Sequence, residues 1–196
     1  MKSSFWFLVV VVCLLLGPVP AMAAEEVEEE RGLGFWFEAR TFGDGETPSR
    51  FTGWYERELA GSVGFYALIE RESDGYHEWY VGPTVRPFPW LQIGLGFGRE
   101  TVPGEINGER RNAFFEIDWE QINVSGTFEN GESGRWHRVT TTYTLNDYVG
   151  VGVIEETDFD VGPRIELNLG SFQIWGAVFR TLEGETLSTV AVNASF

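Results

Sequence analysis

The chain has little of two residue types, cysteine and lysine. Its 196 residues include one cysteine, Cys13, and one lysine, Lys2. Residues 24–196 therefore contain no disulfide, and a secreted fold of this composition must gain its stability in another way. They carry thirteen arginines against thirty acidic residues, a net charge of −17. This charge disfavours nucleic acid and anionic surfaces as partners, and it suits cations or divalent ions that bridge to lipopolysaccharide.

Histidine is also scarce, and catalytic motifs are absent. The two histidines, His77 and His137, lie outside any nucleophile motif such as G-x-S-x-G. The chain has no glycine-rich phosphate loop and no zinc-ligand spacing. The acidic connections do not follow a calcium-loop pattern. We therefore predict no catalytic residues, no metal site and no cofactor.

The longest apolar run lies near the start of the chain and is too short for a membrane-spanning helix. It covers residues 5–16, whereas a span needs about 20 residues. Lys2 precedes the run, and the small-x-small sequence Ala21-Met22-Ala23 follows it. This order is typical of a cleavable secretion signal, predicted over residues 1–23 with cleavage near Ala23. Residues 24–32 then form a short acidic tail.

The remaining chain, residues 33–196, shows the two-residue alternation of β-strands. Between positions 91 and 98, for example, apolar side chains at odd positions alternate with Gln92 and glycines at even positions. Each segment is close to the roughly 9–11 residues of a tilted membrane strand. A merged hairpin would reduce the count to ten. The twelve predicted segments are 33–42, 50–60, 62–72, 75–86, 90–101, 110–119, 121–130, 133–145, 147–158, 160–170, 172–182 and 186–196.

The connections between these segments alternate in length and charge. Odd-numbered connections are longer and acidic, such as 43–49 and 102–109. Even-numbered connections are short, such as Glu120-Gln121, where the apolar set changes from odd to even positions. Short turns at one end and longer loops at the other are expected of an outer-membrane barrel. The predicted fold is therefore all-β, a single closed antiparallel transmembrane barrel over residues 33–196.

In such a barrel one face of each strand meets lipid, and the other face lines a polar interior. Arg71 and Arg180 fall on the lipid-facing side near the long connections, where they could pair with lipid phosphates. We expect the interior side chains to be hydrated or paired, because an unpaired buried charge is costly. The predicted interior, pore-lining residues are Glu38, Arg40, Glu56, Glu58, Glu70, Glu78, Arg86, Glu116, Asp118, Arg164, Glu166 and Asn168.

Aromatic side chains collect near the predicted strand ends, as expected for two belts at the membrane interfaces. The facing of segments 133–145 and 172–182 is ambiguous from the sequence. The belt near the short connections comprises Phe88, Trp90, Trp119, Tyr148, Phe172 and Phe196, and the other comprises Phe51, Tyr76, Phe128, Trp136 and Phe159.

The last segment resembles the C-terminal strand of bacterial outer-membrane β-barrel proteins. Ser188, Val190, Val192 and Ala194 alternate up to the terminal Phe196. The resemblance implies that Phe196 is the assembly signal and that the partners are outer-membrane lipid, lipopolysaccharide and the barrel assembly machinery. Twelve-stranded relatives include acidic-sugar porins, whose pores are lined by basic residues. The reversed charge here argues against an acidic sugar as cargo.

These patterns predict a passive porin-type channel of the bacterial outer membrane, with an acidic lumen that favours cations or small neutral solutes. Glu116, Asp118, Glu56 and Glu166 are the first candidates for selectivity, with Arg86 and Arg164 as opposing charges. One alternative is a closed structural barrel filled by ion pairs. A second is a barrel enzyme that acts on lipids through a histidine. The sequence makes no prediction of oligomeric state.

Overall fold

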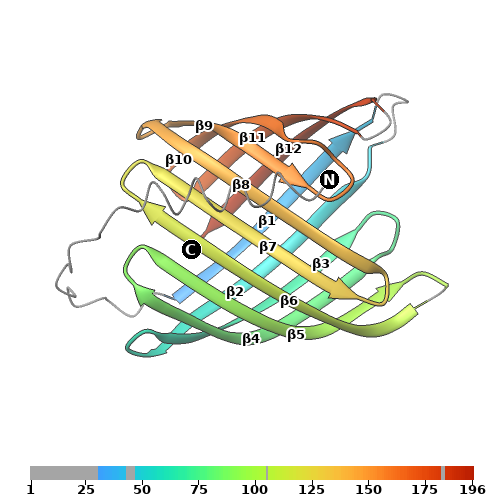
Figure 1. Ribbon diagram of the computed structural model, residues 1–196, viewed down its shortest axis with the longest axis horizontal. Helices are drawn as coiled ribbons and strands as arrows, with labels where there is room; N and C mark the ends of the chain where they lie inside the picture. The colour runs from blue at the N-terminus through green and yellow to red at the C-terminus, as the bar shows by residue number, and fades with distance from the viewer. Residues whose placement is uncertain (1–30, 43–46, 105, 182–183) are drawn as a thin grey trace, which may run out of the picture.

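A computed structural model describes residues 31–42, 47–104, 106–181 and 184–196, and it shows a closed barrel of twelve antiparallel strands (Figure 1). Each strand pairs with its sequence neighbours, and β1 pairs with β12. The twelve-strand prediction is confirmed. The strands are β1 (Arg31–Thr41), β2 (Ser49–Ala60), β3 (Val63–Glu72), β4 (His77–Phe88), β5 (Leu91–Val102), β6 (Ile106–Trp119), β7 (Ile122–Gly131), β8 (Gly134–Asn146), β9 (Val149–Glu156), β10 (Gly162–Leu169), β11 (Phe172–Arg180) and β12 (Thr186–Ser195).

The strand boundaries follow the predicted segments closely, with one larger difference. The predicted connection 102–109 is mostly strand, because Val102 pairs with Ile106 and the hairpin turns at Gly104, whose φ is +79°. A glycine tolerates this left-handed conformation, so a tight turn joins β5 and β6 where the polar composition of 102–109 predicts a longer loop. β1 begins at Arg31, two residues before the predicted segment. The predicted signal, and the acidic tail up to residue 30, lie outside the described residues.

The connections divide the barrel into two ends. Two-residue turns follow β2, β4, β6, β8 and β10, and they lie at the left in Figure 1 together with the C-terminus. We call this the short-turn end. The connections at the other end, the loop end, run from two residues between β7 and β8 to seven between β1 and β2. Within the described residues, no helix is long and apolar enough to span a membrane.

The terminal residue closes the barrel. The backbone N–H of Phe196 donates to the carbonyl of Leu33 at 2.8 Å, and the N–H of Leu33 donates to the carbonyl of Phe196 at 3.1 Å. The Phe196 ring centroid lies 6.1 Å from that of Phe35 and 6.5 Å from that of Phe172. Phe196 thus joins β1, β11 and β12 at the seam. Its role as an assembly signal stays a prediction.

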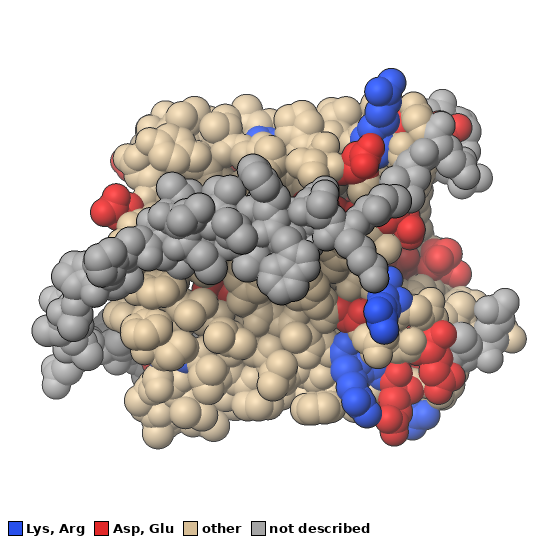
Figure 2. All heavy atoms as spheres, in the orientation of Figure 1, with Lys and Arg blue, Asp and Glu red and all other residues tan. Residues whose placement is uncertain are grey.

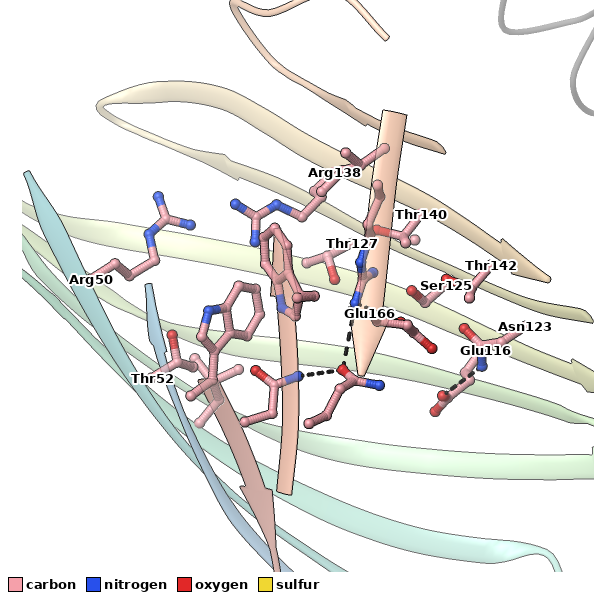
Figure 3. Close-up of a pocket in the computed structure, with 18 of the residues that line it drawn as sticks. Arg50, Thr52, Glu116, Asn123, Ser125, Thr127, Arg138, Thr140, Thr142 and Glu166 are labelled. Atoms are coloured by element: carbon pink, nitrogen blue, oxygen red, sulfur yellow. Dashed lines mark hydrogen bonds and ion pairs between the residues drawn. The ribbon is translucent and has the colours of Figure 1, made fainter. Parts of the chain in front are cut away.

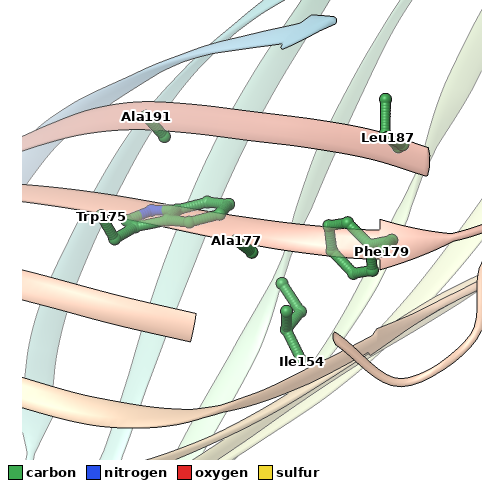
Figure 4. Packing of buried hydrophobic residues seen from close by; sticks show 6 residues of the cluster. All are labelled: Ile154, Trp175, Ala177, Phe179, Leu187 and Ala191. Carbon is green, nitrogen blue, oxygen red and sulfur yellow. The ribbon is translucent and has the colours of Figure 1, made fainter. Parts of the chain in front are cut away.

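The outer surface is apolar over most of its height, and the interior is mixed. Figure 2 shows the charged side chains gathered mainly toward the loop end, with uncharged residues across the middle. Inside, an apolar cluster covers the wall formed by β9, β11 and β12 (Figure 4). The chain therefore fills part of its own interior with hydrocarbon, as small barrels do. The cluster comprises Ile154, Trp175, Ala177, Phe179, Leu187 and Ala191.

The predicted aromatic belt at the short-turn end is largely present, whereas three members of the other belt turn inward. Trp90 contacts Phe88 and Trp119 at centroid distances of 5.1 and 5.5 Å. At the loop end, Trp136 shares the inward phase of β8, and its indole N–H donates to Glu156 at 3.2 Å. The Tyr76 hydroxyl donates to Glu78, and Phe159 packs against the apolar cluster. Their polar and apolar partners lie inside the barrel, so these rings are not lipid anchors.

Close strand approach between β4 and β5 depends on glycine. A Cβ added at the inward-facing Gly98 would overlap the carbonyl oxygen of Trp79. At the outward-facing Gly53 the nearest atom would be Ile69 Cγ2, at an ordinary 3.5 Å. We expect Gly98→Ala to lower the free energy of unfolding by about 3 kcal/mol, and Gly53→Ala to change it by less than about 0.5 kcal/mol. Urea titration of the fraction that migrates as folded barrel on unheated gels measures both. Equal stability of the two variants would contradict the close approach.

Candidate functional site

All twelve side chains that the sequence assigns to the interior point inward. Their part in permeation stays a prediction. They are Glu38 and Arg40 on β1, Glu56 and Glu58 on β2, Glu70 on β3, Glu78 and Arg86 on β4, Glu116 and Asp118 on β6, and Arg164, Glu166 and Asn168 on β10.

The half of the interior nearer the loop end contains an ionic layer, in which buried arginines and carboxylates join strands across the barrel. Its geometry matters because a buried charge is stable only when it is paired and hydrogen-bonded. Its members are Arg40, Arg50, Arg110 and Arg138, with Glu38, Glu70, Glu72, Glu78, Glu100, Glu129 and Glu156.

Arg110 is the centre of one part of this layer. Its guanidinium nitrogens lie 2.8 Å from Glu78, 2.7 Å from Glu100 and 2.9 Å from Glu129. It also donates to the hydroxyl of Tyr80 at 2.8 Å. The Arg110 side chain is 5% exposed. Its three carboxylate partners lie on β4, β5 and β7, so this buried cation on β6 connects four strands.

Arg138 is the centre of the other part. It donates through two nitrogens to Glu38, each at 3.0 Å, and through two nitrogens to Glu156, at 2.6 and 2.8 Å. Arg40 contacts the same two carboxylates at 2.6 Å. Because Glu38 lies on β1 and Arg138 on β8, this network crosses the interior instead of following the wall.

Aromatic rings cover the charged groups of the layer. The Arg138 guanidinium lies 4.9 Å from the Trp36 ring centroid, 5.5 Å from that of Trp136 and 5.9 Å from that of Trp175. The Arg50 guanidinium lies 5.3 Å from the centroid of the same Trp136 ring. Such contacts attract a cation to the ring face and are stronger where water is excluded. Trp136 therefore bridges two arginines that come from β2 and β8.

Arginine pairing is sparser nearer the short-turn end. Glu116 and Asp118 both accept from the amide of Asn123, at 3.2 and 2.6 Å, and neither lies within salt-bridge distance of a described arginine. Glu56 accepts a hydrogen bond from Gln92, which in turn accepts from Arg86 at 2.9 Å. The amide side chains thus satisfy carboxylate oxygens without neutralising their charge.

The polar interior forms two hollows that share one boundary. An inner cavity of about 400 Å³ extends from Arg50 and Arg138 toward Asn168 and Asn193 (Figure 3). An outer vestibule of about 420 Å³ opens among the loops and contains Tyr76 and the described residues around it. Four side chains line both hollows and form their shared boundary, which we call the constriction: Arg50, Glu70, Glu129 and Trp136.

Hydroxyl groups form one wall of the inner cavity. Figure 3 shows Ser125 and Thr127 on β7 beside Thr140 and Thr142 on β8, all turned toward the same space. On the facing side, Trp36 Nε1 and Asn193 Oδ1 have no hydrogen-bond partner within the described protein. Hydroxyl groups along the wall of a cavity can provide hydrogen bonds to a polar molecule.

Sequence reasoning missed most of the ionic layer. Glu100 and Glu129 continue the inward phase of their segments, so the alternation alone could have identified them. Arg110 was placed at the first residue of a segment and not assigned a side. Trp136 and Arg138 lie in segment 133–145, whose mixed polarity left its facing ambiguous. Their inward orientation becomes clear only from pairing with β7 and β9.

The two histidines lie on the outer face near the loop end. His137 Nδ1 is 2.9 Å from the Thr157 hydroxyl, and its Nε2 is 3.8 Å from Glu155. The hydroxyl already accepts the backbone N–H of His137 at 2.7 Å, and the second distance exceeds a hydrogen bond. His77 Nδ1 faces the carbonyl of Gly75 at 3.3 Å. Neither arrangement provides the nucleophile, base and orienting group that lipid hydrolysis requires.

Within the part of the chain that the structure describes, no three histidine, cysteine or acidic side chains are grouped so that they could hold a metal ion. The carboxylates of the ionic layer face arginines instead.

Comparison with known proteins identifies the fold and not a family. No protein-family model and no curated protein sequence matches the chain. The barrel superposes on a protein solved in work on the in-meso crystallization of membrane proteins, with a TM-score of 0.60, 10% identity, and coverage of 85% of this chain and 83% of that one. It also superposes on the NanC porin, with a TM-score of 0.53, 7% identity, and coverage of 84% and 100%. The chain therefore has a porin-type barrel fold.

The pairing of Arg110 predicts a large and specific effect on stability. We expect Arg110→Gln to cost about 3–5 kcal/mol, because Glu78, Glu100 and Glu129 would lose the cation that they share. Arg180→Gln is the matched control, because Arg180 is an exposed arginine on the outer face of β11. Its effect should stay below about 1 kcal/mol. Urea unfolding followed by tryptophan fluorescence measures both, and similar losses would contradict a central role for Arg110.

Proposed function

We propose that this protein is a passive porin-type channel of the bacterial outer membrane, and that its acidic lumen favours cations or small neutral solutes. The single observation that carries the proposal is the pair of polar hollows, inner cavity and outer vestibule, that meet at the constriction inside a closed barrel. The apolar outer surface supports a membrane location, since a closed barrel leaves no unpaired strand edge in lipid.

The charge balance supports the preference for cations. Six arginines on the described strands face the interior against twelve acidic side chains, which leaves a surplus of six negative charges. Rings of like charge in a pore attract ions of the opposite sign. The acidic set comprises Glu38, Glu56, Glu58, Glu70, Glu72, Glu78, Glu100, Glu116, Asp118, Glu129, Glu156 and Glu166, and the arginines are Arg40, Arg50, Arg86, Arg110, Arg138 and Arg164.

The surplus is not evenly distributed along the lumen. In the ionic layer each arginine contacts at least two carboxylates, so much of the charge there is compensated. Glu116 and Asp118 are held only by an amide. We therefore assign the selectivity of the channel to these two residues, with Glu56 as a third member on the adjacent wall. Glu166 differs, because its carboxylate lies 3.0 Å from Arg164.

The constriction sets the size of what can pass. Arg50 lies beside Trp136 and is held by Glu70 at 3.2 Å and by Glu72 at 2.5 Å. A solute must move past this pair to travel from the vestibule to the inner cavity. Ions and small polar molecules fit this restricted path better than large substrates do.

The alternative functions fit the geometry less well. A barrel filled entirely by ion pairs would not contain a cavity of about 400 Å³ lined by hydroxyl groups. An adhesion barrel needs a broad surface, and the loops here have at most seven residues. A histidine-dependent enzyme would need an oriented base. His137 lies 3.8 Å from Glu155, beyond hydrogen-bond distance, and His77 faces a backbone carbonyl.

Ion selectivity provides the first test. In a planar bilayer under a KCl gradient, the folded protein should give a reversal potential that favours cations. The Glu116→Gln/Asp118→Asn variant should shift this potential toward zero, because it removes two uncompensated charges. Glu109→Gln is the matched control, because this substitution removes a carboxylate charge from an exposed, outward-facing position. An equal shift in the control would contradict selectivity in the lumen, and absence of conductance from folded protein would contradict the channel itself.

The constriction provides a second, independent test. Trp136→Ala removes the ring between Arg50 and Arg138, so we expect a larger single-channel conductance. Trp90→Ala, at the outer surface of the short-turn end, removes a ring of the same size and should leave conductance unchanged. Single-channel recording of both variants measures the difference. Unchanged conductance in Trp136→Ala would show that the narrowest point lies elsewhere.

A further inference from the structure

Five arginines face outward at the loop end, among apolar, polar and acidic neighbours such as Phe97 and Glu109. They differ from the interior arginines in exposure, since all five are exposed to the surroundings of the barrel. Figure 2 shows basic side chains collected toward this end. We call this set the arginine band: Arg71 on β3, Arg99 on β5, Arg111 on β6, Arg135 on β8 and Arg180 on β11.

The charges of the band are largely unpaired. Arg71, Arg111, Arg135 and Arg180 make no ion pair or side-chain hydrogen bond with the residues that the structure describes. Arg99 donates to the backbone carbonyl of Asn107 at 3.1 Å. Every interior arginine, by contrast, contacts at least one carboxylate. An arginine on the membrane-facing surface is costly unless its guanidinium reaches an anionic headgroup.

The band is asymmetric along the barrel axis. At the short-turn end the outward-facing strand positions are mainly apolar or aromatic, such as Phe65, Ile117 and Leu169, and Arg57 there is half-buried. Among the side chains that the structure describes, exposed arginines lie at one end of the barrel and not at the other. This asymmetry indicates a membrane whose two leaflets differ in anionic charge.

Two members of the band lie in one row of the sheet. Arg111 is the register partner of Asn130, and Asn130 is the partner of Arg135. Two strand spacings place the two backbones about 10 Å apart. His137, two residues after Arg135 on the same face, stacks on Phe128 with a centroid distance of 6.2 Å. Two guanidinium groups and an imidazole thus share one small area.

An apolar hollow adjoins this row. Arg111, Arg135 and His137 stand at its edge. Its remaining surface includes Leu95, Phe97, Ala113 and Phe128, and the small side chain of Ala113 lies between larger neighbours. A molecule that carries phosphate above and hydrocarbon below matches both parts of this surface.

We infer that the Arg111–Arg135 row of the arginine band is a docking surface for the phosphorylated glycolipid of the outer leaflet, with these two arginines binding its phosphates and the adjoining hollow receiving an acyl chain. Arginine favours this role because its planar fork binds phosphate oxygens in pairs. Arg135 borders both the outer vestibule and the apolar hollow, whereas Arg111 borders the hollow alone. This inference requires a membrane location and does not require that the barrel conduct.

Titration with defined lipids tests the inference. Folded protein in a zwitterionic detergent is titrated with diphosphoryl lipid A, with lipid A lacking both phosphates, and with inorganic phosphate, while tryptophan fluorescence reports binding. We expect diphosphoryl lipid A to bind, and Arg111→Gln/Arg135→Gln to weaken this binding by about thirtyfold. Arg180→Gln is the matched control, an exposed arginine of the same band three strands from Arg135, and should change affinity by less than about threefold.

Each result separates the glycolipid from other sources of the signal. Equal binding of the dephosphorylated lipid would overturn the phosphate contact, and equal losses in both variants would overturn the assignment to the Arg111–Arg135 row. If inorganic phosphate displaced lipid A at comparable concentrations, the row would be a site for free anions and not for the glycolipid. If the double variant does not fold, Arg111→Gln and Arg135→Gln singly should each weaken binding by about fivefold. Conductance measured on the same samples distinguishes failure here from failure of the proposed channel.

Discussion

The structure depends on one constraint: an arginine inside a barrel must be surrounded by acceptors. Arg138 meets this constraint through Glu38 and Glu156, which come from β1 and β9. Because β1 and β8 lie across the barrel from each other, the contact fixes the cross-section as well as the charge. No disulfide is available in residues 24–196, so strand pairing and these buried networks must hold the barrel together.

The ionic layer also determines where the lumen can be. The apolar cluster around Trp175 and Phe179 occupies the wall of β9, β11 and β12 and excludes water there. The remaining space runs beside the hydroxyl groups of β7 and β8 toward the short-turn end. A cation that enters this space leaves a compensated layer and approaches Glu116 and Asp118, whose charges are uncompensated. The paired charges of the ionic layer and the charges proposed to select ions thus lie at different levels of one interior.

The two-residue period explains why the architecture could be predicted and the ionic layer could not. Alternation at positions 91–98 assigns each residue a side without reference to any other strand, so strand count and facing followed from the sequence. Arg110 and its carboxylates come from four different strands, and no local pattern relates them. Trp136 was expected in a belt because it lies near a strand end. Its inward position depends on the register with Glu129, which no single segment specifies.

The geometry of the ionic layer suits arginine better than lysine. Arg110 uses Nε and both terminal nitrogens to contact three carboxylates, and Arg138 binds two carboxylates through paired nitrogens. An ammonium group presents one point charge and three donors without this planar geometry, and it loses its proton more readily when buried. On the outer surface, the same planar fork suits phosphate oxygens. One cationic side chain is therefore suited to both surfaces of the wall: it pairs with carboxylates inside, and outside it fits the phosphate contact that we propose.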